Sequence, residues 1–175
     1  MVLRCLEARD RAEYVRVHEA SARLYADWLP ARGPEVTWSD WFDGELEKNE
    51  LDTNLRLVGA LPDGRFAGFF NLGEIVRGFF WSAYAGWRTN VEVAGQGYGY
   101  EGVKGMLDVA FSAQPGLHRV QANIVPTNAK SIRIAERAGF RREGLALKYL
   151  QIAGTWQDHV MFAKLAEEHV AGRGR

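Results

Sequence analysis

A glycine-rich turn between a strand and an amphipathic helix constrains this chain more than any other feature. Gly95, Gly97 and Gly99 lie in the segment VEVAGQGYGYEG, which spans residues 91–102. Glycine lets the backbone curl closely, so the unpartnered N–H groups at the start of the helix can point at one spot. The turn therefore predicts a cradle for an anion such as a phosphate.

The residues after this turn predict a helix, a strand and a second helix. The first helix is indicated by an apolar stripe at helical spacing, formed by Val103, Leu107, Ala110 and Phe111. Apolar and polar residues then alternate over residues 118–125, as in a strand with one buried face. Pro126 ends the strand, and the second helix begins at Thr127 or Asn128 and ends at Gly139.

Glycines in this arrangement occur in three kinds of phosphate-binding loop. Gly97, Gly99 and Gly102 spell the GxGxxG of dinucleotide-binding folds, but about ninety residues precede them and no acidic residue ends the next strand. A Walker-type loop needs a Gly-Lys-Ser/Thr, which does not follow here. The third kind is favoured by the sequence on both sides of the turn.

Four segments around the turn resemble, in order and spacing, the GNAT superfamily of acetyl-CoA-dependent N-acetyltransferases. They are GQGYGYEG, LHRVQANIVPTN, NAKSIRIAERAGF and GTWQDHVMFAKL. The likeness is to the RimJ/RimL type, which acetylates the N-terminal amines of ribosomal proteins, and it is clear over residues 80–165. One difference is Ala94, because the loop of the family usually begins there with Arg or Gln.

The resemblance implies an α/β fold (an α+β mixed sheet) of GNAT type, in which helices flank a mostly antiparallel central sheet with splayed middle strands. We expect residues 1–166 to form a single domain and residues 167–175 to form a polar tail that frays. Helices are expected from Asp10 and from Thr37 or Ser39. Further strands are expected at Met1–Leu6, Leu55–Ala60, Phe66–Leu72, Phe79–Arg88, Arg142–Ile152 and Trp156–Leu165.

Acetyl-CoA is the acyl donor that the resemblance implies. Its pyrophosphate suits the N–H groups at the turn and the positive end of the following helix. These N–H groups belong to Gln96, Gly97, Tyr98, Gly99 and Tyr100. By the same resemblance, the pantetheine arm should lie beside a strand end formed by Val91 to Val93.

Asn128 and Ser131 are three residues apart on the first turn of the second helix, so they share a face. The resemblance implies that Asn128 holds a pantetheine amide and that the Ser131 hydroxyl gives a proton to the departing sulfur. Helix capping is the alternative role for either residue. Lys130, Arg133 and Arg137 are further candidates for contact with the nucleotide phosphate.

The general base is not evident from the sequence. An N-terminal amine has a pKa of about 7.7 to 8.0, against about 10.4 for lysine, so a useful neutral fraction exists near pH 7 even with a weak base. Glu92 and Glu143 are the candidate bases, with Tyr84 and Tyr149 as contacts for water or substrate. The histidines, which are expected to pack or to lie at the surface, are His18, His118, His159 and His169.

The acceptor cleft is expected beside the N-terminal helix pair, by resemblance to the family. Trp28 and Trp38 are candidate substrate contacts, although packing onto the sheet is the alternative for each. The acceptor could be a protein N-terminus or a small amine such as an antibiotic, polyamine or amino acid, and a narrow, acidic cleft would favour the small amine. Outside the enzyme class, a non-catalytic acyl-CoA sensor is the alternative.

Composition excludes several other classes of protein. Lys plus Arg and Asp plus Glu both number 22 in 175 residues, so zero formal charge gives no general attraction to nucleic acid or to an anionic membrane. The single Cys5 excludes an internal disulfide, and no stretch resembles a signal peptide or membrane span, so a cytoplasmic protein is expected. No metal is expected. Phe79, Phe80 and Trp81 hint at an interface, which leaves a homodimer open.

Overall fold

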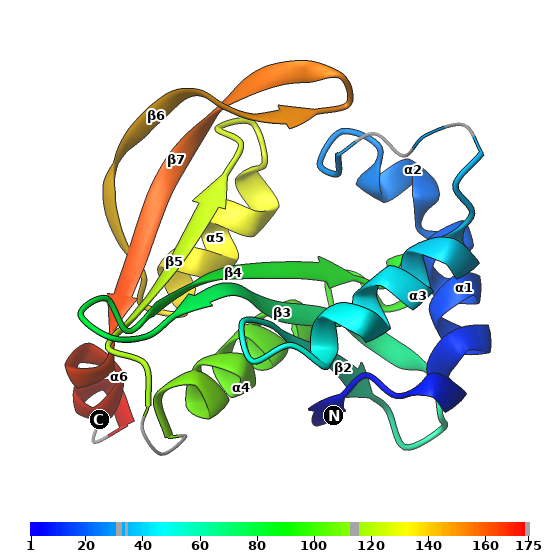
Figure 1. Ribbon diagram of the computed structural model, residues 1–175, viewed down its shortest axis with the longest axis horizontal. Helices are drawn as coiled ribbons and strands as arrows, with labels where there is room; N and C mark the ends of the chain where they lie inside the picture. Colours follow the sequence, from blue (N-terminus) through cyan, green and yellow to red (C-terminus); the bar gives the residue numbers. More distant parts are fainter. Residues whose placement is uncertain (31–32, 34, 113–115, 174–175) are drawn as a thin grey trace.

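The computed structural model describes residues 1–173 apart from 31–32, 34 and 113–115, and for residues 170–173 it describes the backbone alone. Its strands form one sheet in the order β1-β2-β3-β4-β5-β7-β6 (Figure 1). The strands are β1 (Val2–Cys5), β2 (Leu55–Ala60), β3 (Phe66–Val76), β4 (Ser82–Thr89), β5 (Arg119–Ile124), β6 (Arg141–Ile152) and β7 (Thr155–Leu165). This mixed sheet, flanked by helices, confirms the expected fold class.

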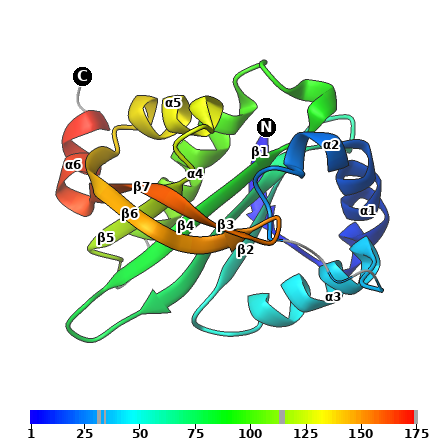
Figure 2. The same ribbon diagram turned by 90° about the horizontal axis from the view of Figure 1, so that it is seen from above.

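Helices cover both faces of the sheet (Figures 1 and 2). The helices are α1 (Arg11–Ala20), α2 (Ala22–Tyr25), α3 (Trp38–Asn49), α4 (Tyr98–Ser112), α5 (Ala129–Arg137) and α6 (Ala166–Arg173), with short 3₁₀ turns at Ala8–Asp10 and Val91–Val93. Within the described ranges, no helix is both long and apolar enough to cross a membrane.

Alternation along β3 separates the two larger cores. Phe69 packs with Tyr14 of α1 and Phe42 of α3, whereas its neighbour Phe70 packs with Val103 of α4 and other residues of the larger core. Successive side chains of a strand point to opposite faces, so the two phenylalanines attach helices to opposite sides of one strand.

The strands before the glycine turn form an antiparallel meander, as expected, but their bounds differ from expectation. β3 extends to Val76, and β4 begins at Ser82, so Phe79 and Phe80 lie in the connecting loop rather than in a strand. Gly78 and Trp81 take positive φ angles of 75° and 41° in this loop, and such angles interrupt an extended strand.

The middle of the sheet splays between β4 and β5. These strands run parallel and pair only from Ser82 to Tyr84 with Arg119 to Gln121. Beyond this point β4 continues to Thr89 and β5 to Ile124, while β5 pairs on its other side with β7 throughout its length. The separation confirms the expected splayed middle strands, and it leaves the ends of both strands with one free edge each.

The C-terminal segment is helical, whereas a fraying tail was expected from residue 167. His169 is buried, its Nε2 lies 2.6 Å from Oδ1 of Asp108 in α4, and its ring packs 5.2 Å from the ring of Phe111. Glu168 forms an ion pair with Arg141 of β6. These contacts dock α6 against α4 and β6, and such tertiary contacts are not visible in a short polar sequence.

Candidate active site

The glycine turn has the left-handed backbone that its sequence predicts. Gly95 and Gly97 have φ angles of 85° and 94°, values that favour glycine. The carbonyl of Gly97 accepts the N–H of Glu101 at 3.1 Å, which is the first backbone bond of α4. The N–H groups of Tyr98, Gly99 and Tyr100 therefore precede the first intrahelical bond, as an anion-binding helix start requires.

Gly99 lies in close contact with two other elements. A Cβ atom at this position would lie 3.0 Å from both Cδ1 of Ile134 in α5 and Oγ1 of Thr89 in β4. Such distances are below ordinary van der Waals contact, so the absence of a side chain lets the start of α4 approach both elements. The turn, the end of β4 and the start of α5 are thereby brought together.

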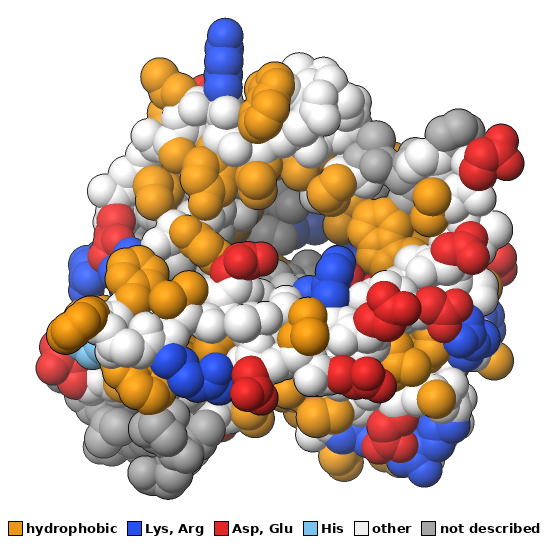
Figure 3. Space-filling view, in the orientation of Figure 1, with side chains coloured by type: hydrophobic (Ala, Val, Ile, Leu, Met, Phe, Trp, Pro, Cys, Tyr) orange, Lys and Arg blue, Asp and Glu red, His pale blue; other side chains and the backbone are white. Residues whose placement is uncertain are grey.

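A cavity of about 730 Å³ lies where β4 and β5 separate, and Figure 3 shows the surface hollowed there. One side is formed by residues 85–89 of β4, residues 123–125 at the end of β5, and the first turns of α4 and α5. The opposite side is formed by Leu24, Tyr25, Trp28, Leu29, Trp41, Glu45, Arg56 and Asn71. The cavity thus joins the glycine turn to the N-terminal helices.

Five of the residues expected to bind the acyl donor line this cavity: Gly97, Gly99, Tyr100, Asn128 and Ser131. Two others from the turn are not part of the lining. The N–H of Gln96 is already donated to the carbonyl of Val93 at 3.3 Å, and Tyr98 packs against the small core around Leu61 and Val93.

The expectation of a strand end at Val91 to Val93 is wrong. These residues form a 3₁₀ turn, in which Val91 is exposed and Val93 is buried with Leu61 and Ala67. Asn90 starts the turn by accepting the N–H of Glu92 on its side-chain oxygen at 3.0 Å. The free strand edge that borders the cavity lies earlier, at residues 85–89 of β4.

Asn128 and Ser131 combine the two roles that the sequence left open. The side-chain oxygen of Asn128 accepts the backbone N–H of Ser131 at 3.1 Å, so Asn128 caps α5. Both residues also line the cavity. The cap occupies the Asn128 oxygen and the Ser131 backbone, while the side-chain amide of Asn128 and the hydroxyl of Ser131 take no part in that bond.

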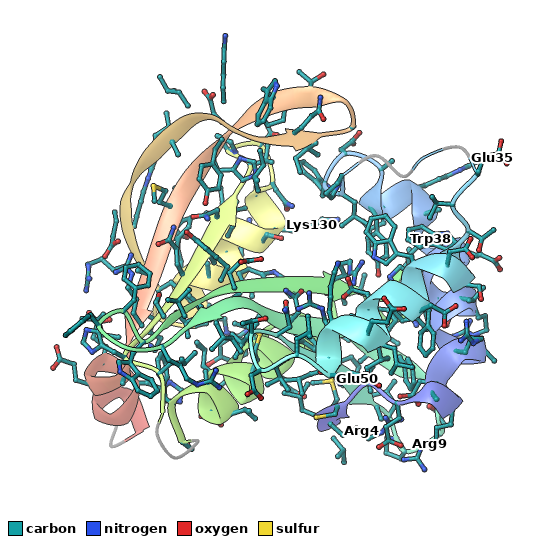
Figure 4. The ribbon with its side chains drawn as sticks, viewed as in Figure 1. Arg4, Arg9, Glu35, Trp38, Glu50 and Lys130 are labelled. Carbon is teal, nitrogen blue, oxygen red and sulfur yellow. The ribbon has the colours of Figure 1, made fainter. Side chains whose placement is uncertain are left out.

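Cations gather at the α5 side of the cavity. Lys130, Arg133 and Arg137 all belong to its lining, and the guanidinium of Arg137 lies 4.1 Å from the ring centroid of Tyr100. Figure 4 shows Lys130 at the start of α5, at the opening between this helix and the N-terminal helices. This charge suits a ligand that carries phosphate groups.

The indole N–H of Trp87 bears on whether the cavity fits a polar ligand such as acetyl-CoA. Its Nε1 atom is a buried donor for which the described residues provide no acceptor, and the residue lines the cavity. A buried N–H without an acceptor costs free energy unless a ligand supplies one. Together with the helix start and the cations, this donor fits a ligand rich in carbonyl and phosphate oxygens.

Glu92, expected as a base, is not placed for that role. Its carboxylate lies 2.7 Å from Nη1 of Arg16, and it does not belong to the cavity lining. The hydrogen bond from Arg16 lowers the pKa of Glu92, which makes this carboxylate a weaker proton acceptor.

Glu143 is excluded on similar grounds. It accepts hydrogen bonds from Arg119 at 3.1 Å and from Arg141 at 2.9 Å. These bonds, with that of Arg119 foremost, lower the pKa of Glu143 to about 2. The residue lies outside the lining and would remain ionised through the whole neutral range.

Tyr84 and Tyr149 are neighbours outside the cavity lining, and Tyr149 contacts one residue of the lining. The side-chain amide of Asn123 donates to the Tyr149 hydroxyl at 3.0 Å, and Asn123 belongs to the lining. Burial, with a further contribution from a hydrogen bond with Tyr84, raises the pKa of Tyr149. The structure therefore brings this predicted pair to the cavity only through Asn123.

The two tryptophans predicted as substrate contacts, Trp28 and Trp38, lie in different surroundings. Trp28 lines the cavity, whereas the ring of Trp38 packs 4.6 Å from the His18 ring and 5.7 Å from the Trp41 ring. Trp41 takes the cavity position that Trp38 was expected to share. Figure 4 shows Trp38 on α3.

Several polar residues of the cavity were not expected from the sequence. They are Glu45, Arg56, Asn71, Arg88, Asn123 and His159. Glu45 and Arg56 form an ion pair, with Oε2 and Nε 2.6 Å apart and both side chains about nine-tenths buried. In β2, Arg56 lies between Leu55 and Leu57. Because successive side chains of a strand point to opposite faces, this position indicated that Arg56 faces away from the main core.

Comparison with protein families and known proteins gives consistent results. Residues 1–141 match a family model described as an acetyltransferase (GNAT) domain. The [ribosomal protein uS5]-alanine N-acetyltransferase of Escherichia coli (strain K12) is 34% identical over 178 residues, which cover 99% of this chain and 91% of that protein. The probable N-acetyltransferase YjcK of Bacillus subtilis (strain 168) is 38% identical over 124 residues, which cover 71% of this chain and 67% of that protein.

Solved structures share the fold over nearly the whole chain. A ribosomal-protein-S5-alanine acetyltransferase from Vibrio fischeri has a TM-score of 0.83 and 26% identity, covering 94% of this chain and 92% of that one. RimJ of Mycobacterium smegmatis, in complex with CoA-disulfide, has a TM-score of 0.82 and 27% identity, covering 99% and 88%. A spermidine N-acetyltransferase from Vibrio cholerae has a TM-score of 0.81 at 21% identity, which shows a common fold alone.

Proposed function

This chain belongs to the GNAT family of acetyltransferases, and on that premise we propose that it transfers the acetyl group of acetyl-CoA to the N-terminal amine of a protein. The relative from Escherichia coli and the structure from Vibrio fischeri are both named as acetyltransferases that act on an alanine of one ribosomal protein. Their likeness extends over almost all of this chain, including the N-terminal helices that border the acceptor side of the cavity.

The charge of the cavity is the observation that carries this choice of acceptor. Glu45 is the single carboxylate among the described residues of the lining, and Arg56 already pairs with it at 2.6 Å. Arg88 adds a further positive charge to the lining. A polyamine carries several cations and needs several carboxylates to replace its hydration, whereas a protein N-terminus presents one amine followed by neutral peptide groups.

Each part of the cavity then has a task in the reaction. The N–H groups at the start of α4 bind phosphate oxygens, and Lys130 and Arg133 neutralise their charge. Acetyl-CoA, when bound, supplies an acetyl group activated as a thioester. Asn128 positions the pantetheine amide, and the Ser131 hydroxyl gives a proton to the departing thiolate.

The acceptor enters from the side of α2 and α3. Trp28 and Trp41 cover this side of the cavity, and they exclude water from the reacting amine. The open mouth between α3 and the β6–β7 hairpin gives a chain end access to the point where β4 and β5 separate (Figure 3). A cavity that continues from one side to the other supports a direct transfer, with donor and acceptor bound together.

Release of free CoA thiol with three acceptors tests the proposal. The acceptors are a peptide with a free alanine or serine N-terminus, the same peptide N-blocked but containing lysine, and spermidine. Turnover with the free N-terminus alone is the expected result, because the cavity holds one paired carboxylate. Turnover with spermidine, and none with the free N-terminus, would contradict the proposal and move the acceptor to the small amines.

A further inference from the structure

The carboxylates near the cavity do not provide a general base. Glu45 is held in its ion pair with Arg56, so taking a proton would break a buried interaction. Glu92 and Glu143 lie outside the lining, each paired with arginine. The other side chains of the cavity are therefore the remaining candidates for a proton acceptor from the protein.

The tyrosines of the lining are also engaged. Tyr25 donates its hydroxyl hydrogen to the carbonyl of Thr89 at 3.0 Å, and burial raises its pKa. Tyr100 lies beneath the guanidinium of Arg137. Among the described residues that line the cavity, His159 provides the one imidazole, and a neutral imidazole ring accepts a proton on the nitrogen that carries no hydrogen.

His159 lies at the separation point of the sheet. It belongs to β7, next to Val160, which pairs with Ile124 at the very end of β5. The residue is 3% exposed, and its ring centroid lies 5.5 Å from that of Tyr149. Asn123, which binds the Tyr149 hydroxyl, lines the cavity with it.

The hydrogen bonding of the ring decides which nitrogen is available. Nδ1 of His159 lies 3.0 Å from the carbonyl oxygen of Gln157. A carbonyl oxygen only accepts, so Nδ1 carries the hydrogen, and in the neutral ring Nε2 holds the lone pair. A fixed tautomer with one basic nitrogen is the arrangement that a general base requires.

We infer that His159 is the general base of the transfer, with Nε2 removing a proton from the ammonium form of the acceptor amine, directly or through one water molecule. This inference rests on the proposed function. The N–H bond of the ammonium breaks and leaves its electron pair on nitrogen, which then forms the bond to the thioester carbonyl carbon. The carbon–sulfur bond breaks towards sulfur.

The remaining proton transfers balance the reaction. Sulfur receives the proton of the Ser131 hydroxyl, and the oxygen of Ser131 regains a proton from the nitrogen that has been acylated. His159 returns its proton to solvent. One ammonium and one thioester thus give one amide, one thiol and one proton.

His159→Asn is the decisive variant, because the asparagine amide can still donate to the Gln157 carbonyl while the basic nitrogen is lost. We expect kcat to fall by about 10²-fold or more, with little change in the KM for acetyl-CoA. The deficit should narrow at high pH, since an N-terminal amine is already neutral above its pKa of about 7.7 to 8.0. His118→Asn is the matched control, because His118 is exposed and does not belong to the lining.

The nitrogen NMR shifts of His159 provide a readout that needs no acceptor. We expect a protonated Nδ1 and an unprotonated Nε2 in the free enzyme. The opposite tautomer, or a His159→Asn enzyme with the kcat of the wild type, would overturn the inference. The inference would also be overturned by a loss of kcat that does not change with pH and is equally large in His118→Asn.

A wrong choice of acceptor would give different results from a wrong choice of general base. A wild-type enzyme that acetylates spermidine and not the peptide would contradict the proposed function, and the His159→Asn comparison would then be made with spermidine and keep its meaning. If none of the three acceptors is used, the tautomer of His159 still decides whether Nε2 can act as a base.

Discussion

Asn128 Oδ1 accepts the backbone N–H of Ser131 at 3.1 Å within the wall of the cavity. One hydrogen bond thus caps α5 and fixes the Ser131 backbone beside the space where a donor thioester is proposed to lie. Since the cap uses the backbone of Ser131, its hydroxyl can be removed without loss of the helix start.

Ser131→Ala is therefore expected to lower kcat by about 10²-fold and to leave the affinity for acetyl-CoA unchanged. Steady-state kinetics and calorimetric titration of acetyl-CoA measure the two effects. Asn128→Ala is the informative comparison, because it also removes the cap and should lower the free energy of unfolding by about 1 kcal/mol. A Ser131→Ala enzyme with normal kcat would remove the hydroxyl from the mechanism.

Gly97→Ala should weaken acetyl-CoA binding by 10-fold or more. Gly97 has a φ angle of 94°, and a Cβ atom there would meet no protein atom within 4 Å. Gly97 also lines the cavity where the phosphate is proposed to bind, so the new methyl group would take up space there. Gly64 is a matched control in the turn between β2 and β3, with a φ angle of 87° and equal space. Each change should cost about 1–2 kcal/mol of stability, but only the first should affect acetyl-CoA. Equal affinity in both variants would contradict the phosphate cradle.

Arg133→Gln should raise the KM for acetyl-CoA several-fold, because Arg133 lines the α5 side of the cavity with Lys130 and Arg137. The effect should shrink as salt is added, since screening weakens an exposed charge interaction. Arg142→Gln, an exposed arginine of β6 outside the lining, is the control. Kinetics at low and high ionic strength compare the two variants, and an equal rise in KM for both would argue against a phosphate contact.

The glycine turn and the start of α5 could be predicted from sequence because each is encoded locally. Gly97 needs its positive φ angle, and Asn128 caps the helix three residues before Ser131, so neighbouring residues suffice to identify both. Their likeness to a known loop then suggested a ligand. Interactions between groups that are close in the chain can thus be predicted from the sequence.

The roles of Glu92 and His159 could not be predicted for the opposite reason. Glu92 is neutralised by Arg16, which is 76 residues away in the chain. His159 reaches the cavity because β4 and β5 separate, and no local pattern tells which side chain of β7 lies at that opening. Both depend on tertiary contacts, as does the docking of α6 through His169 on Asp108.

Glu143 makes part of the stability depend on pH. Its pKa is lowered from 4.5 to about 2, chiefly by Arg119, so the ionised form stabilises the fold above about pH 4.5, and this contribution is lost as the pH falls towards 2. The side chain is 29% exposed, so screening limits the effect to about 1 kcal/mol. Urea unfolding should show Glu143→Gln less stable than wild type at pH 7, with a much smaller gap at pH 2.5. A constant gap would mean that the carboxylate charge is not the cause.

The Glu45–Arg56 pair should show strong energetic coupling. The two side chains are 10% and 11% exposed, so Glu45→Gln leaves a buried guanidinium without a counter-charge and should cost about 3 kcal/mol of unfolding free energy. The double variant with Arg56→Gln should be more stable than the sum of the single changes predicts, because neither charge is then left alone. Glu47→Gln, at an exposed position of the same helix, is the control and should change little. Additive losses in chemical denaturation would show that the pair does not act as a unit.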